Sequence, residues 1–228
     1  MLIVSALSFG LPACAGRSSI LPTFSSAEVA RFAGASGGEL QLGNIVKTTT
    51  QPNRIVAARD GSIWYTTKNH PFVIRVSSDG SIKSWRAPDP DRGETQTLFI
   101  VEAKDGSIWF DYSTPGEDSC GNGVGHIVAE KLTVFKAQHC EEPWGIAIGK
   151  DGRAYVVDLN AFSVEAFNDK GLDAVYTIQN EGGWAAPDYI ASGPDGNLWM
   201  SADHFIAKMD VHGNTQMFRL DRDKDPKP

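Results

Sequence analysis

The stretch DGSIW occurs at Asp60–Trp64 and again, unchanged, at Asp105–Trp109. Two looser copies follow, DGRAY at Asp151–Tyr155 and DGNLW at Asp195–Trp199, so that successive copies start 45, 46 and 44 residues apart. Self-similarity at a fixed period of about 20–50 residues is typical of proteins built from stacked structural repeats. The four copies therefore predict a repeat architecture.

Each copy lies in a longer common unit. An Ile stands five residues before each Asp, a Pro stands eight residues before it in three copies (Thr97 in the other), and a Trp or Tyr follows four residues after it. Each unit has a second turn-forming dipeptide, which is Asp79-Gly80, Glu130-Lys131, Lys170-Gly171 or His212-Gly213. Asp-Gly between alternating apolar runs favours type I′ hairpins, with φ > 0 at both central residues. Each unit thus predicts four short strands joined by tight turns.

Four-stranded antiparallel sheets repeated along a chain are typical of β-propeller blades. We expect an all-β fold with four full blades, at residues 51–88, 97–138, 143–179 and 187–220, and a partial N-terminal blade at 28–32 and 39–50. The aromatic residue after each Asp-Gly is expected to fill the space between neighbouring blades. If the ring is incomplete, self-association is expected to cover the exposed sheet edges.

The repeated pattern resembles a known family. P-x-x-I-x-x-x-x-D-G-x-[IL]-W, then I-x-[RK]-[VM]-x-x-x-G and an outer strand ending in an aromatic, resembles the virginiamycin B lyase-type propellers, and is similar to NHL and gluconolactonase-like ones. The match covers residues 50–220 and is good at 190–200 with 206–218. It implies a lactone-opening elimination with a His base, acidic residues and magnesium on the central face. That family has a Glu three residues after the Trp, where this chain has Thr67, Tyr112, Asp158 and Ala202.

Residues at strand ends are the remaining site candidates. His204, Asp203 and Asp158 are the candidate catalytic residues, and Asp111, Asp158 and Asp203 are the candidate metal ligands. A ring of carboxylates with one His could hold Mg²⁺ or Ca²⁺, or act as acid and base. The alternative is that they are solvated loop residues or that they cap backbone N–H groups at strand ends. With 28 acidic residues in the chain, we favour this alternative.

The N-terminal residues favour export. Residues 1–13, MLIVSALSFGLPA, are uncharged and apolar but too few to span a bilayer as a helix. Leu11-Pro12-Ala13-Cys14 resembles a bacterial lipobox, which makes Cys14 a candidate for lipidation. An ordinary export signal and a buried first strand are the alternatives. We divide the chain into an export segment (1–13), a tether (14–26), the propeller domain (27–220) and a mobile tail (221–228).

The other two cysteines predict a disulfide. If Cys14 carries lipid, Cys120 and Cys140 remain as an even pair in an oxidising compartment, where disulfides persist. A bridge would close a loop of about 20 residues and stabilise the fold by roughly 3 kcal/mol. The alternative, a metal site of His126, His139 and Cys140, lacks the tight ligand spacing of such sites.

The overall charge bears on the partners. A net charge of −7, a pI near 5.2 and the lack of any dense Lys/Arg cluster exclude nucleic acid as the main partner. Two functions stay open. The first, which we favour, is an exported, lipid-anchored propeller of the cell envelope, or a secreted one, that binds a protein, peptide or glycan. The second is a metal-dependent C–O lyase or lactone hydrolase. A lipid anchor would be the only membrane contact.

Overall fold

The computed structural model describes residues 50–89, 95–114, 121–138, 143–180, 183–184, 186–202 and 204–220. They belong to one compact unit, Val46–Pro228. The described residues form strands and turns without any helix, and so none of them builds a helix that could cross a membrane. The predicted export segment, tether and tail lie outside the described residues, as does the partial blade except for Thr50. Cys14, Cys120, Cys140 and Asp203 also lie outside them.

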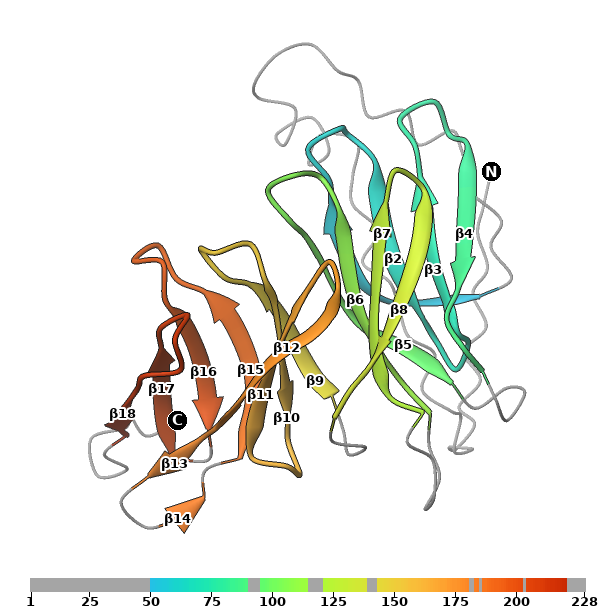
Figure 1. The fold of residues 1–228 in the computed structure, drawn as a ribbon. Coiled ribbons are helices and arrows are strands. Elements are labelled where there is room, and N and C mark those ends of the chain that lie inside the picture. Colours follow the sequence, from blue (N-terminus) through green and yellow to red (C-terminus); the bar gives the residue numbers. More distant parts are fainter. Residues whose placement is uncertain are drawn as a thin grey trace, which may run out of the picture. The chain divides into compact units, whose positions relative to one another are not determined.

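Four four-stranded antiparallel sheets make up this fold, and in each sheet the strands follow chain order (Figure 1). Sheet one has β1 (Gln51–Ala57), β2 (Ile63–Lys68), β3 (Phe72–Val76) and β4 (Ile82–Arg86); sheet two has β5 (Gln96–Glu102), β6 (Ile108–Ser113), β7 (Gly123–Val128) and β8 (Lys131–Lys136); sheet three has β9 (Pro143–Ile148), β10 (Ala154–Asp158), β11 (Ser163–Asn168) and β12 (Gly171–Thr177); sheet four has β15 (Pro187–Ser192), β16 (Leu198–Ala202), β17 (Phe205–Met209) and β18 (Thr215–Arg219). A short pair, β13 (Gln179–Asn180) and β14 (Gly183–Trp184), precedes sheet four. The four predicted blades are confirmed.

The Asp-Gly dipeptides occupy equivalent turns between the first two strands of every blade, as predicted. The predicted turn type is wrong there, because φ is positive at Gly61 (82°) but not at Asp60. The Gly61 N–H donates to the Ala58 carbonyl, and the Ala58 N–H donates to the Ser62 carbonyl, which is a type I turn followed by a glycine bulge. The Asp60 carboxylate explains the difference, since it accepts the Ser62 N–H (2.8 Å) and so fixes the Asp in a right-handed turn.

A two-residue turn with φ > 0 at both positions occurs elsewhere. It lies at Ala129 (φ 45°) and Glu130 (φ 65°), between the paired residues Val128 and Lys131. This is one residue before the dipeptide expected from the sequence. Neither residue is a Gly, so the sequence has here none of the Gly-containing dipeptides from which such a turn is predicted.

The aromatic residue of the repeated phrase is tied back to its own turn. In the third blade the Tyr155 hydroxyl donates to Asp151 Oδ2 (2.9 Å). In the first blade Trp64 Nε1 donates to Ser62 Oγ (2.9 Å), which in turn donates to Asp60 Oδ1 (2.5 Å). Trp199 repeats the bond in the fourth blade, to Asp195 Oδ1 (3.1 Å). In these three blades the position uses the N–H or O–H of its aromatic side chain, which explains why it holds Trp or Tyr there.

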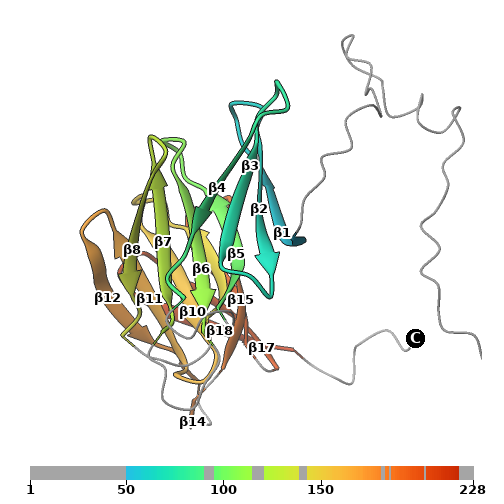
Figure 2. The same cartoon turned by 90° about the vertical axis from the view of Figure 1, so that its right-hand side faces the viewer.

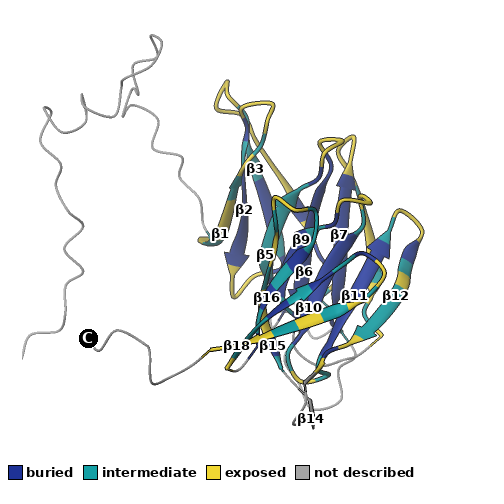
Figure 3. Ribbon diagram, turned by 90° about the vertical axis from the view of Figure 1, so that its left-hand side faces the viewer, coloured by how far each residue is buried: buried dark blue, intermediate teal, exposed yellow. Residues whose placement is uncertain are grey.

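The core lies between neighbouring blades, and burial is concentrated in their middle strands (Figure 3). Trp64 packs with Ile108 and Phe110 of the second blade. Trp109 packs in a cluster with the third blade, and Tyr155 in one with the fourth. The predicted place of the repeated aromatic is thus confirmed for three blades. Trp199 is only partly buried and stacks on Phe218 (5.8 Å between ring centroids), and no described sheet follows the fourth.

The first strands of the blades, β1, β5, β9 and β15, lie next to one another in that order (Figures 1 and 2). Each has a register shift near its start, for example between Pro52 and Ile55 in β1 and between Thr97 and Ile100 in β5. Such bulges leave backbone groups unpaired and turn side chains out of the ladder. The bulged segments therefore form a surface of their own, which carries the site described next.

Candidate ligand-binding site

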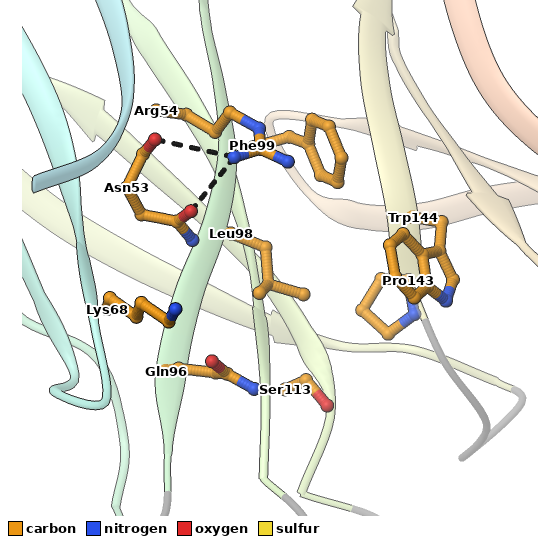
Figure 4. A pocket seen from close by; sticks show the side chains of 9 residues that line it. All are labelled: Asn53, Arg54, Lys68, Gln96, Leu98, Phe99, Ser113, Pro143 and Trp144. Carbon is orange, nitrogen blue, oxygen red and sulfur yellow. Dashed lines mark hydrogen bonds between the residues drawn. The ribbon is translucent and has the colours of Figure 1, made fainter. Parts of the chain in front are cut away.

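A pocket of about 230 Å³ opens over the first strands of the first three blades (Figure 4). The β1 bulge supplies Asn53 and Arg54, and the β5 bulge supplies Leu98 and Phe99. The nine lining residues are Asn53, Arg54, Lys68, Gln96, Leu98, Phe99, Ser113, Pro143 and Trp144. Three separate blades thus contribute to one site, at a place where the ladder hydrogen bonds of the strands are interrupted.

The pocket is cationic. Arg54 and Lys68 line it, and no Asp or Glu is among its lining residues. Arg54 Nη1 donates to Asn53 Oδ1 (3.0 Å), and the guanidinium carbon lies 4.9 Å from the centroid of the Phe99 ring. Neither cation forms an ion pair with any carboxylate in the described part of the chain. The positive charge therefore remains available to an anionic ligand.

Aromatic rings from three successive first strands contact one another, and two of them, Phe99 and Trp144, line the pocket. Phe99 of β5 meets Tyr189 of β15 edge to face, with ring centroids 5.7 Å apart, and Trp144 of β9 meets the same Tyr189 at 6.4 Å. Tyr189 is 50% exposed, so the group is not sealed into the core. Edge-to-face contacts hold these rings in fixed orientations.

Side chains of the second strands cap the bulges. In three blades the residue two positions after the repeated aromatic accepts a hydrogen bond from the bulged backbone. The three pairs are the Arg54 N–H with Thr66 Oγ1 (3.0 Å), the Phe99 N–H with Asp111 Oδ1 (2.5 Å) and the Tyr189 N–H with Ser201 Oγ (3.2 Å). The second blade therefore uses a carboxyl where two others use a hydroxyl.

Asp111 is fully buried, and its Oδ2 atom has no hydrogen-bond partner. Burial raises the pKa of this carboxyl to about 8, against the opposing effects of the Phe99 amide and the positive charge of Arg54. Asp111 is therefore largely protonated at neutral pH. The sequence singled out Asp111 as a candidate metal ligand, and the structure places it as the cap of the bulge that carries Phe99.

Asp158 and His204, two other candidates from the sequence, do not line this pocket. Asp158 ends β10, is buried, and accepts the Ala161 N–H (3.0 Å), which is the capping role that we gave as the alternative. His204 is exposed in the turn between β16 and β17. Within the described ranges, no three His, Cys, Asp or Glu side chains are grouped as metal ligands are. The residues that the structure describes therefore offer no ligand set for Mg²⁺ or Ca²⁺.

His126, considered for a metal site with His139 and Cys140, is a core residue. Its ring stacks on Trp109 with 3.7 Å between the centroids, and burial lowers its pKa. His139 and Cys140 lie outside the described residues. Of the positions where the resemblance implies Glu, Thr67 donates its hydroxyl to the His70 and Phe72 carbonyls (2.9 Å each), which ties it to its own sheet.

The fold defines a β-propeller of four-stranded blades, and its first strands carry a pocket. The chain belongs to the virginiamycin B lyase family, whose model matches residues 38–226. The resemblance seen in the repeated pattern is thus confirmed. No curated protein matches the chain.

Several solved structures are similar to this chain. Virginiamycin B lyase from Staphylococcus aureus has a TM-score of 0.65 at 22% identity, over 77% of this chain and 58% of that one. A catalytically inactive variant of the same lyase, solved with quinupristin, has 0.66 at 21%, over 81% and 59%. A gluconolactonase from Xanthomonas campestris has 0.56 at 16%, over 75% and 62%. The chain thus spans less than two thirds of each, and at these identities the similarity concerns the fold.

Proposed function

We propose that this propeller binds a small organic anion that carries a flat apolar group, and that it does so in the pocket over β1, β5 and β9. The observation that supports this is that two cations, Arg54 and Lys68, line the same pocket as the rings of Phe99 and Trp144, with Arg54 lying over the Phe99 ring. A carboxylate would accept from the guanidinium, and a ring would pack on the aromatic wall. This is a more specific form of the binding role that we favoured from the sequence.

The size of the pocket limits the ligand. Its volume of about 230 Å³ lies below the roughly 300–1,000 Å³ of sites for drug-sized molecules. The pocket fits a single ring with its acid group, either as a free molecule or as one residue of a larger peptide. A ligand of about ten non-hydrogen atoms, at roughly 0.5 kcal/mol per atom, would bind with a Kd of a few tenths of a millimolar.

Calorimetric titration with phenylacetate and its neutral analogue phenylacetamide tests the proposal. We expect phenylacetate to bind and the amide to bind at least about tenfold more weakly, since it lacks the charge that Arg54 and Lys68 attract. Arg54→Gln should weaken phenylacetate binding by a similar factor. Arg219→Gln, on the exposed end of β18, is the matched control and should bind as the wild type does. Equal binding of the acid and the amide would refute the proposal.

Lactone opening is the second candidate function, and membership of the virginiamycin B lyase family favours it. The similar structure solved with quinupristin gives a substrate to test. Such an elimination needs a base at the proton and a cation or donor at the developing negative charge. Since no metal ligand set occurs among the described residues, we expect no magnesium-dependent turnover of quinupristin. Magnesium-dependent turnover that His204→Ala abolishes would make the lyase the leading function.

Export, lipidation of Cys14 and the Cys120–Cys140 disulfide remain proposals that rest on the sequence alone. Labelling of cells with a palmitate analogue should mark the wild type and leave Cys14→Ser unmarked. Thiol labelling of the unreduced protein should find neither Cys120 nor Cys140 reactive. Two reactive thiols at these positions would remove the argument for an oxidising compartment.

A further inference from the structure

One residue beneath the pocket differs in kind from its counterparts in the repeat. Thr66, Asp111, Val157 and Ser201 each lie two residues after the repeated aromatic. Thr66 and Ser201 meet the bulge with a neutral hydroxyl, and Thr66 Oγ1 also donates to the Leu98 carbonyl (2.6 Å) of the next blade. Asp111 has the same acceptor role toward Phe99, but its second oxygen is buried without a partner.

We propose that Asp111 is a positioning residue of the pocket. Its neutral carboxyl holds the Phe99 backbone so that the Phe99 ring lies beside the Arg54 guanidinium. When the carboxyl loses its proton, its negative charge turns Arg54 away from the ligand. The proposal rests on the proposed function, because it names the group that controls that site.

The geometry supports this role from two sides. The Asp111 carboxyl fixes the Phe99 N–H at 2.5 Å, and Arg54 covers the ring of the same residue at 4.9 Å. Phe99 is therefore held at its backbone by one group and at its ring by the other. Both Phe99 and Arg54 line the pocket, whereas Asp111 lies behind it and does not.

The charges around Asp111 are few. Among the described residues, Arg54 on β1 is the one charged group that affects the pKa of Asp111, which its positive charge lowers. On its own sheet, Asp111 pairs with the apolar Val124 of β7, and β5 contributes the Phe99 amide. A negative charge formed at Asp111 would thus act on Arg54 without competition. It would draw the guanidinium away from an anionic ligand, and in a buried site this attraction is stronger than in water.

The pH dependence of phenylacetate binding to the full chain tests this role. In the wild type we expect the Kd to rise about tenfold between pH 6.5 and pH 9.5, because the ligand carboxylate no longer has the Arg54 guanidinium as its partner. Asp111→Asn keeps the acceptor for the Phe99 N–H and cannot ionise, so its Kd should stay level over this range. If Asp111 had a structural role only, Asp111→Asn would weaken phenylacetate binding by the same factor at every pH. A rise of the Kd with pH that is seen in the wild type and persists in Asp111→Asn would overturn the proposal. Asp111→Thr introduces the residue type that the first blade has at this position, Thr66. Its Kd for phenylacetate should also stay level with pH, so that the test remains valid if the Asn variant does not fold.

A readout without ligand separates this proposal from the proposed function. The Phe99 amide proton should shift with pH through a step near pH 8 in the NMR spectrum of the wild type, and the step should be absent in Asp111→Asn. If phenylacetate does not bind but the step is found, the proposed ligand is wrong while Asp111 still positions Phe99. If the step is absent from the wild type, Asp111 does not act on Phe99 and the positioning role is refuted.

Discussion

Replacing Asp111 by Asn should change how the stability of the protein depends on pH. The pKa of the carboxyl is 3.8 for a free Asp and about 8 when it is buried in the fold. Between these values the unfolded chain has lost the proton and the folded protein keeps it, so that unfolding becomes easier as the pH rises. Each pH unit in this window costs the wild type about 1.4 kcal/mol from this one group. The cost is absent in Asp111→Asn, which has no proton to lose.

The size of the effect can be measured as a difference. Between pH 5 and pH 7, the free energy of unfolding of Asp111→Asn minus that of the wild type should increase by about 2.7 kcal/mol. Urea unfolding followed by tryptophan fluorescence at pH 5, 6 and 7 gives both free energies under matched conditions. Comparing the change with pH, rather than one value, removes any constant effect of the new amide on packing. A difference that stays constant from pH 5 to pH 7 would show that Asp111 is ionised in the folded protein.

Three further changes should affect stability. Gly125→Ala would place its Cβ 2.0–2.7 Å from three carbons of the Phe110 ring and should cost about 1–3 kcal/mol in urea unfolding. Trp64→Phe removes the donor to Ser62 and should cost about 1 kcal/mol in thermal unfolding; a variant as stable as the wild type would show that this bond contributes nothing. Because hydrogen bonds from Ser107 lower the pKa of Asp105, its stabilisation is present above pH 3.8 and lost in more acid solution; Asp105→Asn should flatten this loss in acid unfolding.

The blades could be predicted because their signals are local. Asp-Gly turns, alternating strands and the aromatic four residues on are all encoded within one unit, and the same unit is repeated four times. The turn type could not be read from the dipeptide alone. It depends on the Asp60 side chain, which bonds to the Ser62 N–H, and that bond competes with the left-handed conformation that a type I′ turn needs.

The pocket was missed because two of its lining residues occupy a position that varies within the repeat. The residue just before the shared Ile is Arg54 in the first blade, Phe99 in the second, Gly145 in the third and Tyr189 in the fourth. Of these four, Arg54 and Phe99 line the pocket. A position that holds Arg, Phe, Gly and Tyr, while the residues around it stay constant, indicates a surface that differs from blade to blade. Its convergence into one pocket depends on how three blades pack, which no local pattern encodes.

The acidic residues near strand ends, which the sequence offers as catalytic or metal-binding candidates, have a structural role in two cases. Asp111 and Asp158 are both buried, and each accepts a backbone N–H next to a bulge or a turn. A carboxyl satisfies such a group as well as it satisfies a metal ion, and the sequence pattern of the two cases is the same. Only the positions of neighbouring carboxyls distinguish them.

The most direct test of the binding site is to find where phenylacetate contacts the protein. The six Trp residues each give an indole N–H signal in a ¹⁵N-correlated NMR spectrum, and single Trp→Phe variants assign them. Phenylacetate should shift the signal of Trp144, which lines the pocket, and leave those of Trp85 and Trp199 unchanged. The shift should be lost in Arg54→Gln. A shift at Trp199 with none at Trp144 would place the ligand on the fourth blade and contradict the proposed pocket.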